Sequence, residues 1–474
     1  MRPIRFGTEG WRAVLADDYT FDRVRAVARA SANWFKQQPH RAPIAIGHDT
    51  RFLGDRFAAA AADELADGGL DTRLCAGFVP TPAICFYVVE NSLGGAVVLT
   101  ASHNRAEWNG VKVKRPAGAS VLDQDAKWIG EEANRLLSAQ PGGGEKALTR
   151  EHESFDIREA YLDRLLSMVD RDAIARAELI VVADLMHGAG TGFFDEALRR
   201  AGCAEVRAVR AAPDPTFGGM QPEPIGPNLE ASIPLTASPD VAVGLATDGD
   251  GDRFGMMAHG EYLDIQRTIV FILYHLLKHR GWRGRVIRTI NVTSMLDRLC
   301  EHFGCTVTET PVGFKNIAPH MIESTDTILG VEESGGFGIR GHLPDRDGSL
   351  AALTACEALA YERKPVREIL ADVFALAGGE FFFDRDDHRL SQDGRDRVME
   401  RLPSFAPDAI AGQPVAEINR LDGAKFIRKD GSWLLLRLSG TEPLVRVYSE
   451  ARSKQDLAAL LAAGSRVVQE MAGG

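Results

Sequence analysis

The sequence lacks the features that mark membrane-spanning proteins and disulfide-rich secreted proteins. No apolar run approaches the roughly 18 residues that span a bilayer. The 6 Cys residues include no Cys-x-x-Cys pair, so they match neither a disulfide framework nor a zinc site. No apolar segment typical of a secretory signal follows Met1 to Arg5. We therefore expect a cytoplasmic protein that does not bind membranes.

A surplus of basic residues is also absent. The chain has 55 Lys and Arg against 66 Asp and Glu, a net charge of −11, which argues against general nucleic-acid binding. With 474 residues, of which 45% are hydrophobic, it is long enough for several globular domains. Local groups of Arg and Lys can still bind a small anion.

A strand–loop–helix–strand unit occurs three times along the chain. Each unit has the length of a βαβ element, and Gly at each helix end suits a left-handed cap. The wide spacing predicts three similar α/β domains rather than a solenoid. The expected strand pairs are 43–47 with 72–75, 179–183 with 204–209, and 285–289 with 306–310.

Breaker-rich stretches set the expected domain boundaries. Pro141-Gly142-Gly143-Gly144 ends the first domain, and a helix near 153–170 opens the second. The pattern changes again around 362–365, and a final amphipathic helix runs from 453 to about 471. We expect α/β domains at 1–150, 151–255 and 256–374, and a smaller α+β domain at 375–474.

The first loop that carries chemistry is Thr100 to Asn104. It follows the apolar run 94–99, which is typical of a strand buried on both faces. Ser102 offers a hydroxyl, while His103 and Lys112 offer proton-transfer groups, where open α/β sheets usually bind ligands. Ser102 can be a nucleophile or carry a transferred group. Taken alone, the same residues favour a turn whose side chains bond their own backbone.

The second loop, 247–253, carries three Asp residues that alternate with Gly after another apolar run. Carboxylates this close repel one another unless a cation lies among them, and oxygen ligands suit Mg²⁺ or Ca²⁺. An EF-hand is excluded because Arg253 replaces the required Gly and His259 replaces the required Glu. Open coordination positions favour Mg²⁺ that awaits a phosphate oxygen. The carboxylates belong to Asp248, Asp250 and Asp252.

Two further loops follow strand-like segments. The third, 331–336, carries Glu332 and Ser334, which suit sugar hydroxyls, although alone it is equally a turn. The fourth places Ser and Thr hydroxyls on either side of a Gly, with guanidinium groups beside them. Such a turn can cradle a phosphate group. Its members are Arg437, Ser439, Gly440, Thr441 and Arg446.

Together the four loops resemble those of the α-D-phosphohexomutase superfamily, which includes phosphoglucomutase and phosphomannomutase. The family motifs are Thr-Ala-Ser-His-Asn-Pro, Asp-Gly-Asp-Gly-Asp, Gly-Glu-x-Ser-Gly and Ser-Gly/Asn-Thr-Glu-Pro, and their counterparts here occur in family order. The segment Gly7 to Arg12 is similar to the family's Gly-Thr-x-Gly-x-Arg. The resemblance implies three similar α/β domains with mixed sheets and a smaller C-terminal α+β domain around a central cleft.

The resemblance also implies a role for each residue. Ser102 would carry a phosphoryl group, and an oxygen of that group would complete one Mg²⁺ site with the three Asp carboxylates. Lys112 matches the general acid/base, and Glu332 and Ser334 would bind sugar hydroxyls. Arg12, His103 and Arg253 match positions that line the site, and Lys315 matches a lysine that contacts the substrate. The phosphate that does not react would be held by Arg437, Ser439, Gly440 and Thr441.

The implied reaction interconverts hexose 1-phosphate and hexose 6-phosphate, glucose first and mannose second, through a hexose bisphosphate. Phosphoglucosamine mutase stays open, although its sugar loop more often reads Glu-Gln-Ser-Gly-His. A non-catalytic phosphosugar-binding protein is the alternative from another class. We expect a phosphosugar as the partner, and a monomer or a homodimer.

Three positions depart from the family pattern. Arg105 stands where Pro is usual, so the backbone of the serine loop has one constraint fewer. Trp108 replaces a Tyr, and Val331 replaces the Gly that usually opens the sugar loop. None of the three removes a reacting group.

Overall fold

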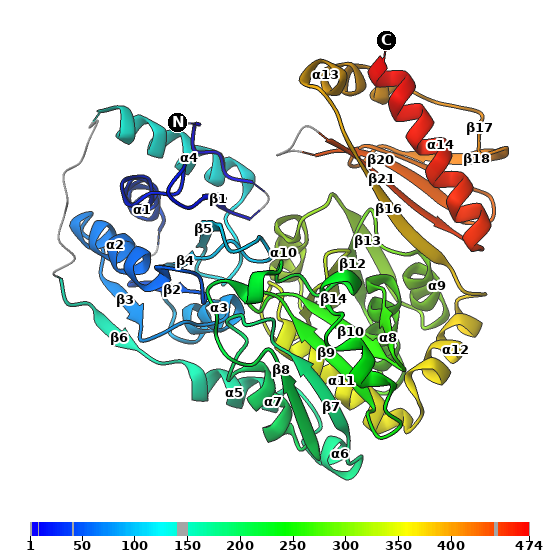
Figure 1. Ribbon diagram of the computed structural model, residues 1–474, viewed down its shortest axis with the longest axis horizontal. Coiled ribbons are helices and arrows are strands. Elements are labelled where there is room, and N and C mark those ends of the chain that lie inside the picture. The colour runs from blue at the N-terminus through cyan, green and yellow to red at the C-terminus, as the bar shows by residue number, and fades with distance from the viewer. Residues whose placement is uncertain (1, 8, 40–41, 140–149, 440–443, 474) are drawn as a thin grey trace.

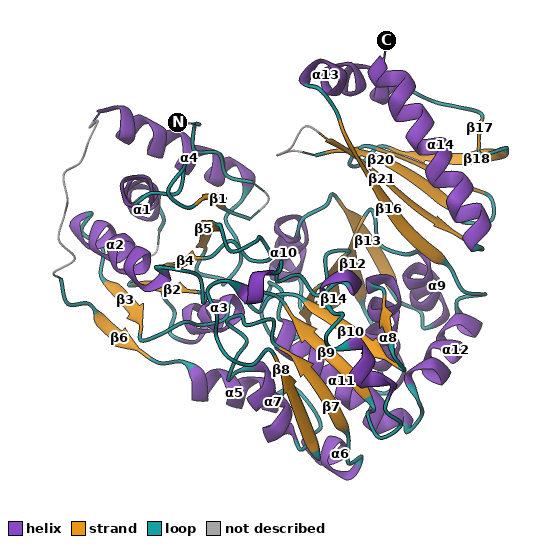
Figure 2. Cartoon of the chain, in the orientation of Figure 1, coloured by secondary structure: helices purple, strands orange, loops and turns teal. Residues whose placement is uncertain are grey.

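The computed structural model describes residues 2–7, 9–39, 42–139, 150–439 and 444–473, which form four sheets (Figures 1 and 2). Three sheets are mixed and have helices packed against them, and the fourth is antiparallel throughout its length. The fold class predicted from the sequence is therefore confirmed. The predicted boundary run 141–144 lies outside the described residues.

The first sheet has the strand order β1-β5-β4-β2-β3-β6. Strands β4, β2, β3 and β6 are parallel, and β5 and β1 run antiparallel to their neighbours. The strands are β1 (Trp11–Val14), β2 (Ile44–His48), β3 (Thr72–Cys75), β4 (Gly95–Leu99), β5 (Trp108–Lys114) and β6 (Glu153–Phe155). The helices are α1 (Phe21–Phe35), α2 (Gly54–Asp67), α3 (Thr81–Glu90) and α4 (Asp123–Ala139).

The helix expected near 153–170 begins later than predicted. Residues 153–155 form β6 and pair with β3 at the edge of the first sheet, so α5 (Arg158–Ser167) starts only after them. Three residues are too few to show a periodic pattern in the sequence. The strand forms because it pairs with β3, which lies far away in the chain.

The second sheet has the order β11-β10-β9-β7-β8, and the third has the order β13-β12-β14-β15. The second contains β7 (Ile180–Asp184), β8 (Glu205–Val209), β9 (Val243–Thr247), β10 (Phe254–Ala258) and β11 (Glu261–Leu263), with α6 (Arg171–Arg176) and α7 (Phe194–Ala201). The third contains β12 (Arg285–Thr289), β13 (Thr306–Thr310), β14 (Thr327–Glu332) and β15 (Gly336–Ile339). Its helices are α8 (Ile265–Lys278), α9 (Ser294–His302), α10 (Phe314–Glu323), α11 (Gly348–Glu362) and α12 (Val366–Leu376).

The three mixed sheets share one local plan. In each, a buried strand with one parallel neighbour ends in a polar loop, and the chain returns as an antiparallel strand on its other side. The pairs are β4 with β5, β9 with β10, and β14 with β15. The serine loop (100–104), the metal loop (247–253) and the sugar loop (331–336) therefore occupy equivalent positions in three domains.

A shared core fixes the first three domains against one another. One cluster of buried apolar residues runs from the first sheet to Phe381, so hydrophobic burial holds these domains together. Helix α11 lies within this core, and every residue from Gly348 to Ala360 is buried. Its sequence is largely apolar around the helix, as expected of a helix that packs against neighbours on all sides.

The fourth domain packs one face of its sheet against two helices. Its strands are β16 (Phe382–Arg389), β17 (Ala409–Ile410), β18 (Gln413–Asn419), β19 (Ala424–Arg428), β20 (Trp433–Leu438) and β21 (Leu444–Ala451). Helices α13 (Gln392–Arg401) and α14 (Lys454–Gly473) cover one face (Figure 2). On the other, Trp433, Leu435 and Tyr448 cluster with Ile290 of the third domain. No helix within the described part of the chain is both long and apolar enough to cross a membrane.

Candidate active site

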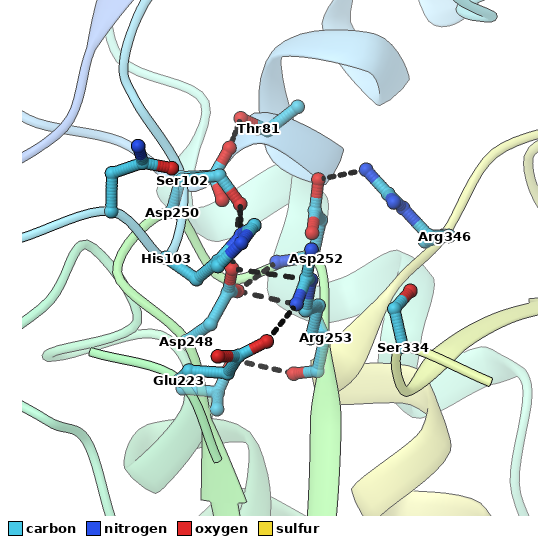
Figure 3. A network of polar contacts seen from close by, with 12 residues as sticks. Thr81, Ser102, His103, Glu223, Asp248, Asp250, Asp252, Arg253, Ser334 and Arg346 are labelled. Atoms are coloured by element: carbon cyan, nitrogen blue, oxygen red, sulfur yellow. Dashed lines mark hydrogen bonds and ion pairs between the residues drawn. The ribbon is translucent and has the colours of Figure 1, made fainter. Parts of the chain in front are cut away.

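The serine loop and the metal loop meet directly. Ser102 is fully buried, and its Oγ donates a hydrogen bond of 2.9 Å to Oδ2 of Asp248 (Figure 3). The backbone of Ser102 has a φ of 51°, in the left-handed region that residues with a side chain rarely adopt. This hydroxyl is therefore held in one orientation, toward the carboxylates of the second domain.

The three Asp residues of the metal loop form a compact group of oxygen ligands. One carboxylate oxygen from each lies within 4.8 Å of the others, and all three residues are buried. Among the described residues, Oδ1 of Asp250 and Oδ1 of Asp252 have no hydrogen-bond partner. Buried carboxylate oxygens without partners are costly, so this donor set fits a hard divalent cation.

Lys112 reaches the same carboxylates from β5. Its Nζ lies 2.6 Å from Oδ2 of Asp250 and 2.8 Å from Oδ2 of Asp252. Burial alone would lower the pKa of Lys112, but the charges of Asp250, Asp252 and Glu9 outweigh it and raise that pKa. Lys112 is therefore a protonated ammonium that can stabilise negative charge and donate a proton.

The carboxylates of the metal loop differ in their proton affinity. Burial, together with the charges of Asp250 and Asp252, raises the pKa of Asp248 well above its ordinary value. Burial opposes ionisation of Asp252 as well, but Arg346 and Lys112 lower its pKa. Asp252 thus stays ionised, whereas Asp248, the carboxyl that accepts from Ser102, takes up a proton more readily.

His103 and Arg12 line the serine loop. The Nδ1 of His103 lies 3.4 Å from Oγ of Ser102, and Arg12 donates to Oδ1 of Asn104 at 2.7 Å. Burial and the positive charges of Arg253 and Arg12 lower the pKa of His103 well below its ordinary value. His103 is therefore a neutral imidazole that can accept a proton.

Arg253 closes the metal loop on its other side. Its Nη1 lies 2.7 Å from Oε1 of Glu223, and its Nε lies 4.0 Å from Asp248 (Figure 3). Across the site, Thr81 donates to Oδ2 of Asp250 at 2.6 Å. Groups of the first and the second domain therefore orient the metal loop from two sides.

The sugar loop joins this network through Arg346. Oε1 of Glu332 accepts from Oγ of Ser334 and from Nη1 of Arg346, each at 2.6 Å. Arg346 also lies 2.6 Å from Oδ2 of Asp252 and pairs with Glu9. One buried guanidinium thus bridges the metal loop, the sugar loop and the N-terminal segment.

The residues predicted in the fourth domain have contacts within that domain. Arg437 Nε donates to Asp422 at 2.7 Å, and Arg446 Nε lies 3.9 Å from Asp387. The backbone N–H of Ser439 donates to Leu444 O at 2.9 Å. Gly440 and Thr441 lie outside the described residues.

Two contacts connect the third domain to its neighbours at this site. Lys315, at the start of α10, pairs with Asp123 of the first domain rather than with the metal loop. Arg385 of β16 lies 3.5 Å from Oε1 of Glu333, so the sugar loop meets the fourth domain. Of these residues, Lys315 was predicted to contact the substrate, and Glu333 lies within the segment 331–336.

Sequence reasoning missed several groups of the network. Arg346 and Glu9 were overlooked, although Arg346 stands between two Asp residues just before the apolar helix α11. Charged residues beside a fully buried helix are a usable signal, because they need partners. Glu223 gives no comparable signal, since it lies in an irregular segment rich in Pro.

These observations define a class of protein: an enzyme with a buried serine facing a metal-binding carboxylate group at the junction of three α/β domains. The comparison with family models agrees domain by domain. Models of the phosphoglucomutase/phosphomannomutase family match domain I at residues 3–140, domain II at 159–261, domain III at 265–376 and the C-terminal domain at 397–464. The chain belongs to the phosphoglucomutase/phosphomannomutase family, and it is an isomerase-class phosphotransferase.

Similar proteins match along the whole chain. A phosphoglucomutase/phosphomannomutase of Thermococcus kodakarensis is 28% identical, with 98% of each chain covered. A probable phosphoglucosamine mutase of Methanosphaera stadtmanae is 27% identical, with 96% of each covered. The crystal structure of a candidate phosphomannomutase of Thermus thermophilus is 35% identical, with a TM-score of 0.85 and 99% of each chain covered. These relatives act on different sugars by name, so the family is established and the sugar is not.

Proposed function

We propose that this enzyme interconverts hexose 1-phosphate and hexose 6-phosphate, with glucose as the leading sugar and mannose as the second. The observation that carries the proposal is the buried contact of 2.9 Å between Ser102 Oγ and Asp248, inside a group of three carboxylates. A serine in this setting suits a phosphoryl carrier, because its oxygen already faces the site of a divalent cation.

The proposed reaction has two transfers that mirror each other. In the first, the bond between phosphorus and Ser102 Oγ breaks while a bond forms from phosphorus to the free sugar hydroxyl oxygen. The hydroxyl proton passes to a neighbour of Lys112 such as His103, because Lys112 is already protonated and can only donate. In the second, the other phosphoryl group of the hexose bisphosphate returns to Ser102, and a proton is returned to the sugar oxygen.

Asp248, Asp250 and Asp252, with an oxygen of phosphorylated Ser102, would hold Mg²⁺, which would supply charge compensation for the transferring phosphoryl group. The unpartnered Oδ1 atoms of Asp250 and Asp252 support this assignment. Glu332 and Ser334 are proposed to bind sugar hydroxyls, and Arg253 and Lys315 are proposed to contact the substrate. The non-reacting phosphate is assigned to Arg437, Ser439, Gly440, Thr441 and Arg446.

Phosphoglucosamine mutase is the second candidate, supported by the similarity to the Methanosphaera protein. Comparing kcat/KM for the 1-phosphates of glucose, mannose and glucosamine, with Mg²⁺ and a trace of the matching bisphosphate, separates the two. The proposal expects the highest value for glucose. A preference for glucosamine of tenfold or more would replace it, and no turnover with any sugar would favour a non-catalytic binding protein.

The identity of the phosphoryl carrier is tested separately. Ser102→Ala is expected to abolish turnover and to remove the phosphoprotein mass that glucose 1,6-bisphosphate generates in the wild type. Ser31→Ala is the matched control, because the buried hydroxyl of Ser31 donates to Val27 O within α1, at 2.8 Å. Phosphate retained on Ser102→Ala would place the carrier elsewhere.

A further inference from the structure

The loop that follows β2 has no part in the reaction described so far, yet it buries two opposite charges. Asp49 and Arg51 form an ion pair of 2.9 Å, and both side chains are completely buried. A buried ion pair is costly to desolvate, and it persists only where further hydrogen bonds satisfy both groups. The remaining contacts of the two side chains therefore indicate the role of this ion pair.

The guanidinium of Arg51 is bonded to the main chain of the serine loop. Its two terminal nitrogens donate to four carbonyl oxygens, three in the connection between β4 and β5 and one at the first residue of β5. The acceptors are Ser102 O and Asn104 O, each at 2.6 Å, Arg105 O at 2.8 Å and Trp108 O at 2.9 Å. A planar fork of donors can gather four carbonyls in this way, whereas a lysine ammonium has only three donors at one point.

Asp49 holds the same loop from its other side. Oδ2 of Asp49 accepts a hydrogen bond of 2.5 Å from Thr100 Oγ1, and Thr100 Oγ1 accepts one of 2.8 Å from the backbone N–H of Ser102. Both backbone polar groups of Ser102 are therefore hydrogen-bonded: its N–H donates to Thr100, and its C=O accepts from Arg51.

This double attachment explains how Ser102 keeps its unfavourable backbone. A φ of 51° is unfavourable for a residue with a side chain, and it persists where the surroundings determine it. The attachment also reaches the second domain, since the guanidinium of Arg51 lies 4.7 Å from the Phe217 ring centroid. Beside it, Thr50 donates to His187 O at 3.1 Å.

We infer that Arg51, oriented by Asp49, is a positioning residue that fixes the serine loop so that Ser102 Oγ faces the metal loop. It does not touch the reacting atoms. The catalytic consequence rests on the proposed function, whereas the holding of the loop does not. The same contacts compensate for Arg105, because the carbonyl at position 105 is held by Arg51 although no Pro ring restricts that residue.

The test compares Arg51→Lys with Arg23→Lys. Arg23 is the matched control: it is a buried arginine of the same domain that lies 3.5 Å from Asp18 and donates to the backbone carbonyl of Arg2 at 2.6 Å, away from the serine loop. Hydrogen–deuterium exchange is followed in peptides spanning 100–108. Arg51→Lys should exchange these amides at least tenfold faster than the wild type, and Arg23→Lys should leave them unchanged.

Steady-state kinetics distinguish a positioning role from a merely structural one, because they separate an effect on kcat from an effect on KM. With the preferred sugar phosphate, Arg51→Lys should lower kcat about 100-fold while KM changes less than about twofold, because misplacing a reacting group slows the transfer step. Arg23→Lys should keep kcat. Equal exchange of peptides 100–108 in Arg51→Lys and wild type would overturn the inference, as would a change confined to KM.

Asp49→Asn keeps the test decisive if Arg51→Lys fails to fold. Asn keeps the shape of Asp49 but removes the charge that orients Arg51, so faster exchange of peptides 100–108 is again expected. Unchanged exchange in Asp49→Asn would then overturn the inference. A wild type without turnover would refute the proposed function alone, because the exchange comparison needs no substrate.

Discussion

Gly249 lies so close to Ser102 that a Cβ atom on it would stand 2.6 Å from the carbonyl oxygen of Ser102. The metal loop can approach the serine loop only because residue 249 has no side chain. Its N–H also donates to Pro222 O at 3.1 Å, so the loop is held from the opposite side. This approach brings Asp248 within reach of the Ser102 hydroxyl.

Gly249→Ala is therefore expected to separate the two loops. The added Cβ would meet a backbone carbonyl oxygen, which cannot rotate away as a side chain can, so one of the two loops must shift. Because the shift would misplace Ser102 relative to Asp248, kcat should fall about 100-fold. Gly77→Ala is the control, since nothing lies within 4 Å of its added Cβ. Steady-state kinetics of both variants check this, and a Gly249→Ala enzyme within twofold of wild type would contradict it.

Mg²⁺ should stabilise the folded protein by mass action, because the assembled carboxylate group exists only in the folded state. The melting temperature of the wild type should rise with Mg²⁺ concentration, and a chelator should abolish turnover. Asp248→Asn should lose the thermal response, whereas Asp163→Asn, on the exposed side of α5, should retain it. An unaltered response in Asp248→Asn would mean that Mg²⁺ binds elsewhere.

Arg346 is expected to be critical for stability as well as for activity. Arg346→Met leaves the carboxylates of Asp252, Glu9 and Glu332 buried without their shared cation. Breaking a buried network in this way typically costs about 3–5 kcal/mol of unfolding free energy. Arg200→Met, which breaks ion pairs at the surface, should cost less than about 1 kcal/mol. Urea unfolding of both variants measures the difference, and equal losses would count against this account.

Arg105→Pro should be tolerated. The side chain of Arg105 is exposed, its φ is not positive, and the loop uses its carbonyl, which Pro retains. We expect kcat within about twofold of wild type and a gain in stability of up to about 1 kcal/mol, because Pro restricts the unfolded chain. A tenfold loss of kcat would show that the N–H or the guanidinium of Arg105 has a role.

Lys425 should make stability depend on alkaline pH. Burial, followed by the charge of Arg288, lowers the pKa of Lys425 to about 8 in the folded protein. Between about pH 8 and 10.5 the unfolded state binds more protons, so the free energy of unfolding should rise with pH, by roughly 3 kcal/mol in all. Lys425→Met should lack this rise when denaturant unfolding is compared across the range. Parallel pH profiles for the two proteins would refute the prediction.

The amino-acid sequence by itself determined the apolar strands that lead into the four loops, the order of these loops, and hence the family. Apolar runs such as 94–99 indicate buried strands because burial requires that composition, and the Asp-Gly alternation of the metal loop indicates a cation site because of local repulsion. Each of these features depends on a few neighbouring residues, so it can be recognised in the sequence alone. The β6 edge strand was missed because three residues carry too little pattern.

Only the tertiary structure decided which charges meet. Arg346 lies 94 residues beyond Asp252, and Arg51 lies 51 residues before Ser102, yet each pair is in direct contact. Such contacts depend on how the domains pack around their shared core, which no local pattern encodes. The sequence named the serine and the carboxylates, whereas packing supplied the arginines that hold them in place.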